Sequence, residues 1–172
     1  MTLKKNIRQN PLVCLLVAGS HALSGRIRFL AQHTTETISM DDGQLFTIFR
    51  HVTLDTNKRN EAETMTVLVI RFKFATLSQK ANRLASLLPI PLIIGFPGFK
   101  EKIWMINNDT GYWQGVYQWE SEEAVEEYKK SFVLGVMNKR ALPGSISYKI
   151  IPNTDLSEYI RRNSINCKRD TA

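Results

Sequence analysis

One stretch of the chain, from Met65 to Pro152, constrains the fold more than any other part of the sequence. It opens with Thr66–Phe74, where hydrophobic side chains alternate so that one face of a strand is wholly apolar. A helical pattern follows, and then come two strand-like runs, Phe99–Asn107 and Tyr112–Glu120, joined by a polar turn.

The rest of this stretch adds a second helix and a fourth strand. Ser121 is suited to cap a helix, and Glu122 and Glu123 suit the positive end of its dipole. A Pro-Gly turn then leads into a last strand, Ser145–Ile151. The order β-α-β-β-α-β predicts an α+β fold, a ferredoxin-like antiparallel sheet with both helices on one face.

We therefore divide the chain into three parts. Residues 1–64 form an extension with an N-terminal helix and a β-hairpin, whose turn is Asp41-Asp42-Gly43, and end in a charged linker at 57–63. Residues 65–152 form the ferredoxin-like domain, and residues 153–172 form a tail with a short helix around Leu156 and Tyr159.

Composition gives no support to several classes of function. The chain has 172 residues and a net charge of +7, yet no stripe of Lys and Arg points to nucleic acid. Its two cysteines, Cys14 and Cys167, lie in no Cys/His cluster, so we expect neither a disulfide framework nor a metal site. No apolar run reaches the ~20 residues needed to span a membrane.

The N-terminus leaves two interpretations open. Basic residues before Leu12–Ala18 and the small-residue pattern at 20–22 give residues 1–22 the outline of a secretory signal. A helix is the favoured alternative, because the apolar spacing continues beyond any cleavage point, and a cytoplasmic location follows from it. Its face is formed by Leu12, Leu16, Leu23, Ile27 and Leu30.

The second face of the predicted sheet needs a cover. Val67, Val69 and Val116 make it too apolar to lie in water. Either the N-terminal hairpin and helix fold over it, or a second copy packs against it in a two-fold dimer that encloses a cavity. The dimer is favoured, because a single symmetric interface covers both copies.

Three segments of the predicted ferredoxin-like domain resemble a known family. Phe96-Pro97-Gly98-Phe99, then Lys102-Ile103-Trp104, then Gly115-Val116-Tyr117-Gln118-Trp119 are similar to the pattern of dimeric α/β-barrel proteins, in particular the YdhR-like monooxygenases near the antibiotic-biosynthesis monooxygenases. The resemblance covers roughly residues 66–152. It implies a homodimer and, for some members, oxygenation of electron-rich aromatic compounds without a metal or flavin cofactor.

Arg71 is the first candidate for a catalytic role. It lies among apolar residues on a strand expected to be central, and a buried guanidinium needs an anionic or polar partner. That partner is either a substrate oxygen or a carboxylate of the protein. Gln114 and Ser147 share its face and would orient the same substrate, although Gln114 and Gln118 could instead satisfy each other or Ser147.

The remaining candidates would bind the substrate. Trp104 and Tyr112 offer stacking planes, whereas Trp113, Tyr117 and Trp119 are expected to fill the core. The other predicted contacts are Gln118, Lys149 and His51. Together with these residues, the resemblance implies a cofactor-independent monooxygenase-like enzyme for a small aromatic or quinone-type compound. The alternative is a non-catalytic dimeric module that binds a hydrophobic ligand or a partner.

Overall fold

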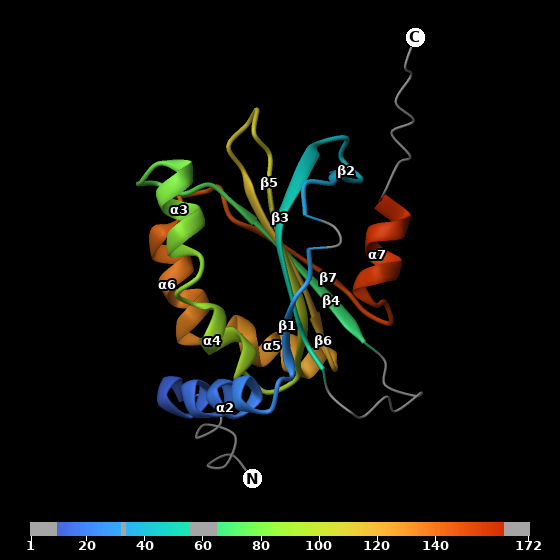
Figure 1. The fold of residues 1–172 in the computed structure, drawn as a ribbon. Helices are drawn as coiled ribbons and strands as arrows, with labels where there is room; N and C mark the ends of the chain where they lie inside the picture. Colours follow the sequence, from blue (N-terminus) through green and yellow to red (C-terminus); the bar gives the residue numbers. More distant parts are fainter. Residues whose placement is uncertain (1–9, 32–33, 56–64, 164–172) are drawn as a thin grey trace.

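A computed structural model describes residues 10–31, 34–55 and 65–163. The linker predicted at 57–63 and the tail from residue 164 lie outside these ranges. One seven-stranded antiparallel sheet forms the centre, in the order β1-β3-β5-β6-β4-β7, and β2 pairs with the first residues of β3. Helices lie on both sides of the sheet (Figure 1). None of the helices within the described residues is long and apolar enough to cross a membrane.

Four strands and the helices between them make the predicted ferredoxin-like unit. The strands are β4 (Thr66–Phe72), β5 (Phe99–Ile106), β6 (Trp113–Trp119) and β7 (Ser147–Ile151). Their spatial order, β5-β6-β4-β7, is that of a β-α-β-β-α-β fold, with every pair antiparallel. The α+β class predicted from the sequence is confirmed.

The helices of this unit cover one side of the sheet, here called the helix face (Figure 1). They are α3 (Gln79–Ala85), α4 (Ile90–Ile94), α5 (Glu122–Lys129) and α6 (Phe132–Arg140). Ser121 caps α5 as expected, Ser78 caps α3, and Ser131 caps the separate helix α6. α3 presents Asn82 to the core and leaves Leu84 exposed, because Asn82 donates to the carbonyl oxygens of Thr76 and Leu77.

The N-terminal extension enlarges the same sheet. β3 (Leu45–Leu54) pairs with the edge of β5, and β1 (Ile27–Phe29) and β2 (Thr37–Ser39) both pair with β3. α2 (Pro11–Leu23) packs on α4 through Cys14 and Ala18. The predicted apolar face of α2 is wrong. The helix ends at Leu23, Ile27 begins a strand, and the Leu12 and Leu16 side chains are 70% and 75% exposed.

The opposite side of the sheet, here called the reverse face, is largely covered by the chain itself. A bulge in β3 between Ile48 and Arg50 bends the strand, so that Phe46 and Ile48 share a buried cluster with Val67 of β4, although β5 and β6 lie between the two strands. α7 (Leu156–Asn163) adds Leu156 and Tyr159 to the same cluster. The reverse face is therefore not bare, and no second copy is needed to bury its apolar centre.

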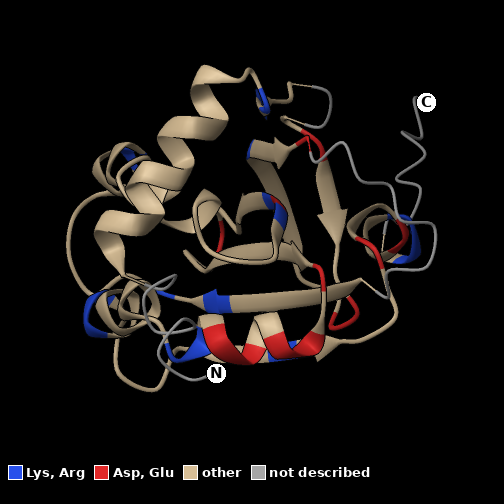
Figure 2. Cartoon of the chain, turned by 90° about the horizontal axis from the view of Figure 1, so that it is seen from below, with Lys and Arg blue, Asp and Glu red and all other residues tan. Residues whose placement is uncertain are grey.

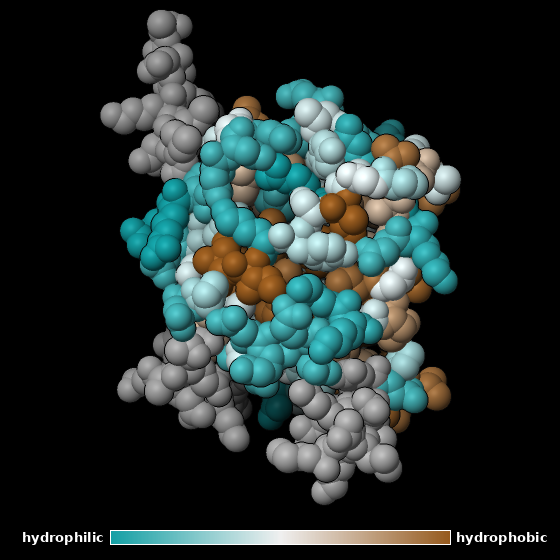
Figure 3. All heavy atoms as spheres, turned by 180° about the vertical axis from the view of Figure 1, so that it is seen from behind, coloured by the Kyte–Doolittle hydropathy of each residue, from teal (hydrophilic) through white to brown (hydrophobic). Residues whose placement is uncertain are grey.

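Charged residues are spread over the molecule (Figure 2). Lys and Arg appear on several separate elements, and α5 carries acidic residues in its first turn. Hydrophobic residues reach the surface in a broken band on the side seen from behind, between hydrophilic regions (Figure 3).

Candidate functional site

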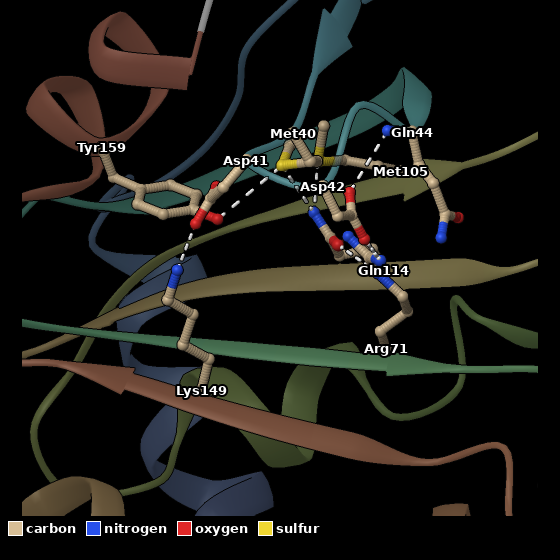
Figure 4. A network of polar contacts seen from close by, with 9 residues as sticks. All are labelled: Met40, Asp41, Asp42, Gln44, Arg71, Met105, Gln114, Lys149 and Tyr159. Carbon is tan, nitrogen blue, oxygen red and sulfur yellow. Dashed lines mark hydrogen bonds and ion pairs between the residues drawn. The ribbon is translucent and has the colours of Figure 1, made fainter.

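The residues predicted for the site meet only in part, in a hollow of about 230 Å³ on the reverse face. Arg71 and Gln114 lie side by side there, and Ser147 and Lys149 line the same hollow. Its far wall comes from the β2–β3 turn and from Tyr159 of α7 (Figure 4).

Arg71 is neutralised by the chain itself. Its Nη1 atom is ion-paired with Asp42, its Nε atom donates to Gln114 Oε1 at 2.9 Å, and the guanidinium lies 4.7 Å from the centre of the Phe46 ring. The amide nitrogen of Gln114 in turn donates to the sulfur of Met40 at 3.3 Å. Of the two partners considered for Arg71, the structure contains the carboxylate.

Lys149 is held in the same way. It is ion-paired with Asp41, the neighbour of Asp42 in the turn (Figure 4). Hydrogen bonds from Lys149 and Arg71 lower the pKa values of the Asp41 and Asp42 carboxyl groups respectively. Both cations of this hollow therefore have protein carboxylates as partners, which leaves less charge to attract an anionic ligand.

Gln118, Tyr112 and His51 are not among the residues that line this hollow. The Gln118 side chain accepts a hydrogen bond from the backbone nitrogen of Leu156 at 2.6 Å and so holds the start of α7. Tyr112 packs at the border of the reverse-face cluster, and its ring centre lies 4.5 Å from Lys73 Nζ. His51 contacts Glu101, with 3.1 Å between Nε2 and Oε2.

Trp104 lies on the helix face, opposite to the face predicted for it. The reason is a second bulge, between Phe99 and Glu101 of β5, which adds one residue to the strand and reverses the alternation that follows. Trp104 consequently shares the helix-face core with Phe99 rather than facing Arg71.

A larger hollow, here called the helix-face cavity, lies between the sheet and α3, α4 and α6. It has a volume of about 290 Å³, near the lower end of the roughly 300–1,000 Å³ typical of ligand pockets. Aromatic rings from β4 and the residues just after it, from β5, β6 and α5 form much of its wall: Phe72, Phe74, Trp104, Trp113, Tyr117 and Tyr128. Leu92, Ile93, Val133, Val136 and Met137 close its other sides.

Lys102 places an amine in this apolar wall. The residue is 5% exposed, and its Nζ atom donates to the Tyr117 hydroxyl oxygen at 2.7 Å. The same nitrogen lies 4.2 Å from the ring centre of Trp104 and 4.0 Å from that of Tyr117. Burial, helped by the positive charge of Arg50, lowers the pKa of Lys102 well below its ordinary value of 10.5.

Burial also raises the pKa of two phenols that line the cavity, Tyr117 and Tyr128. These hydroxyl groups therefore stay protonated and uncharged in the cavity wall. Within the part of the chain that the structure describes, no group of three His, Cys, Asp or Glu side chains could hold a metal ion.

Gly115 makes the position of Lys102 possible. A Cβ atom at residue 115 would lie 2.7 Å from Tyr117 Cε2 and 3.2 Å from Lys102 Cε, so any larger residue would push the two side chains apart. Sequence reasoning missed Lys102 because it follows Lys100 and Glu101 and reads as part of a solvated run. The available signal in the sequence was the position of Lys102 directly before the large apolar residues Ile103 and Trp104.

Comparisons with known proteins bear on the same region. The family model described as "Putative mono-oxygenase ydhR" matches residues 67–151, which confirms the resemblance inferred from the sequence. No curated protein matches the chain.

Solved structures include two of low similarity. One, described as an anthrone oxidase-like protein, has 12% identity and a TM-score of 0.44 over 65% of this chain and 57% of that chain. Another, described as a major regulator of staphylococcal pathogenesis, has 14% identity and a TM-score of 0.43 over 64% of this chain and 67% of that chain. This chain thus spans less than two thirds of the anthrone oxidase-like protein.

Proposed function

With the match of residues 67–151 to the ydhR mono-oxygenase family as the premise, we propose that the protein is a mono-oxygenase-like enzyme acting on a small aromatic or quinone-type compound. The substrate binds in the helix-face cavity. The observation that carries this proposal is the aromatic wall of that cavity, which is interrupted by the buried amine of Lys102. Flat rings such as Trp104 and Trp113 suit a flat, apolar substrate.

The net reaction that fits this environment converts an activated CH₂ group and O₂ into a carbonyl group and water. The substrate supplies all four electrons that O₂ accepts, so no separate reductant enters the balance. The cavity would contribute by binding the substrate and excluding water, which strengthens every electrostatic interaction with the reacting atoms.

The location differs from the one predicted from the sequence. Arg71, Gln114 and Ser147 stay a prediction as residues that orient the substrate on the reverse face. We place the substrate on the helix face instead, because Arg71 already has Asp42 and Gln114 as partners and the reverse-face hollow is smaller.

Oxygen uptake with phenolic and anthrone-like compounds tests the proposal, with the product identified by mass spectrometry. Ala85 lines the helix-face cavity, so Ala85→Trp should fill it and reduce oxygen uptake at least about tenfold, equivalent to ~1.4 kcal/mol of activation free energy. Arg71→Ala should retain most of the uptake. Loss of activity in Arg71→Ala but not in Ala85→Trp would assign the site to the reverse face. If the wild-type protein consumes no oxygen, the proposed enzymatic function is refuted.

A homodimer belongs to the same proposal, since the resemblance implies one. Large hydrophobic side chains remain exposed on and after α6 and on β7, namely Val136, Leu142 and Tyr148, and hydrophobic surface is visible from behind (Figure 3). Measuring the mass in solution decides the oligomeric state, and a monomer at micromolar concentration would exclude a stable dimer.

A further inference from the structure

We propose that Lys102 is the base of the helix-face cavity, an uncharged amine that takes a proton from the bound substrate. The substrate class follows from this role: the molecule carries a phenolic O–H or a C–H group activated by a neighbouring carbonyl. The inference deepens the proposed function and rests on it for the oxygenation step, while the amine itself is supported by independent observations.

The first observation is burial without a counter-ion. Lys102 is 5% exposed, and none of the described carboxylates is within ion-pair distance of it. An isolated buried ammonium is costly, and desolvated lysines respond by losing the proton. The titratable or charged groups that face the amine or line its cavity are Tyr117 of β6, Tyr128 of α5, Arg50 of β3 and Arg140 of α6. None of the four supplies a negative charge at neutral pH.

The second observation is that the amine reaches the cavity. Lys102 lines the cavity directly, and its hydrogen-bond partner is the Tyr117 hydroxyl group, 2.7 Å from Nζ. That hydroxyl oxygen can accept an N–H of an uncharged amine, which leaves the nitrogen lone pair for a bound substrate.

The third observation concerns the charge that forms when the proton is transferred. Nζ lies 4.2 Å from the Trp104 ring centre and 4.0 Å from the Tyr117 ring centre, both within the range of cation–π attraction. These rings favour the ammonium that develops during proton transfer more than the resting amine. An interaction that strengthens as the reaction proceeds lowers the barrier.

The step balances without a further reagent. The substrate X–H bond breaks, its proton forms an N–H bond with Lys102, and the electron pair stays on the substrate as a phenolate or enolate. Molecular oxygen is then the oxidant that accepts electrons from this anion, and the proton on Lys102 leaves with the water that is formed.

Proton transfer can be measured without oxygenation. Anthrone, a compound with a carbonyl-activated methylene group, is incubated anaerobically with the full-length protein in D₂O, and deuterium in the methylene group is followed by NMR. The wild-type protein should accelerate exchange, and Lys102→Met should lower the protein-catalysed rate about 100-fold or more. The matched control is Lys130→Met, an exposed lysine of the α5 C-terminus whose loss should change nothing.

The outcomes separate this inference from the proposed function. If exchange requires Lys102 but the protein takes up no oxygen in air, the role of Lys102 as a base is supported and the mono-oxygenase activity is refuted. Oxygen uptake that survives in Lys102→Met supports the enzyme and overturns the base. Wild-type protein that accelerates no exchange also overturns the base.

A second measurement uses the wild-type protein alone, in case Lys102→Met fails to fold. Benzaldehyde and cyanoborohydride at pH 7 modify uncharged amines, and peptide mass mapping locates the products. Lys102 should react faster than an ordinary lysine, by about tenfold for each unit by which its pKa is lowered. A rate no higher than that of exposed Lys130 would overturn the inference.

Discussion

The crossing of α2 and α4 depends on Gly95, and Gly95→Ala tests this directly. A Cβ atom at this position would lie 1.8 Å from the carbonyl oxygen of Cys14 and 2.5 Å from its carbonyl carbon. The backbone at Gly95 has a φ of −78°, so alanine suits the conformation and only the contact opposes it. Relieving the clash requires the two helices to separate until that distance reaches about 3.0 Å.

The loss of stability in Gly95→Ala follows from the residues packed at the contact between α2 and α4, here called the seam. Cys14 and Ala18 are 0% and 4% exposed, and both belong to the helix-face core. Overpacking that shifts backbone costs about 1–3 kcal/mol, and backbone on both sides places this variant near the upper end. Gly135→Ala is the matched control, because Gly135 is an exposed helical glycine with no heavy atom within 4 Å of the new Cβ, and it should gain about 0.5–1 kcal/mol.

Two assays report on the seam. Urea unfolding gives the free energy of unfolding, and the reaction rate of the Cys14 thiol with DTNB in a Cys167→Ser background reports opening of α2. Burial raises the pKa of the Cys14 thiol, so the wild-type rate should be low and Gly95→Ala should raise it. Unchanged stability and unchanged thiol reactivity in Gly95→Ala would refute the reasoning.

Two further predictions concern the cover of the reverse face. The hydrogen bond from Arg71 lowers the pKa of Asp42, so the ion pair stabilises the fold fully above about pH 3.8, and this stabilisation is lost as the pH falls through the pKa of the folded state. Asp42→Asn should therefore remove this part of the acid transition. At pH 7 it should lower the free energy of unfolding, measured with urea, by less than about 1 kcal/mol, and by less still in 1 M salt. Gln118→Leu removes the acceptor for the Leu156 amide, so it should cost about 1–3 kcal/mol of stability and speed hydrogen exchange in α7. Gln118→Glu keeps an acceptor and should not speed that exchange. Equal exchange rates in the two variants would contradict the capping role.

The strands were predictable because their signal is local. Alternation over Thr66–Phe74 and Tyr112–Glu120 marked β4 and β6 to within a few residues, and the element order then selected the ferredoxin-like unit. The Asp41-Asp42-Gly43 turn likewise marked the β2–β3 hairpin. The division into three parts and the homodimer stay predictions.

The errors come from features that alternation cannot encode. Hydrophobic spacing assigned the large residues Leu12 and Leu16 to the buried side of α2, but a close helix crossing selects small residues, and Cys14 and Ala18 occupy it. The bulge before Trp104 reversed its face for a similar reason, since one inserted residue leaves no mark in a hydropathy pattern.

The candidate site was the hardest part to predict. Gly115, on the neighbouring strand, leaves room for the Lys102 side chain, and the two residues meet only through the strand register that pairs Lys102 with Tyr117 and Gly115 with Trp104. Arg71 was correctly singled out as a residue in need of a partner, but its partner Asp42 lies 29 positions earlier in the sequence. Long-range pairings of this kind require the fold to be known.

The ion pairs Asp41–Lys149 and Asp42–Arg71 have a consequence for biosynthesis. Asp41 and Lys149 are 108 positions apart, so while a ribosome has released only the first 140 residues, the acidic turn has at most one of its two anchors. The acidic turn gains its second anchor only when the final strand emerges, and until then a chaperone would have an incompletely fastened hairpin to protect.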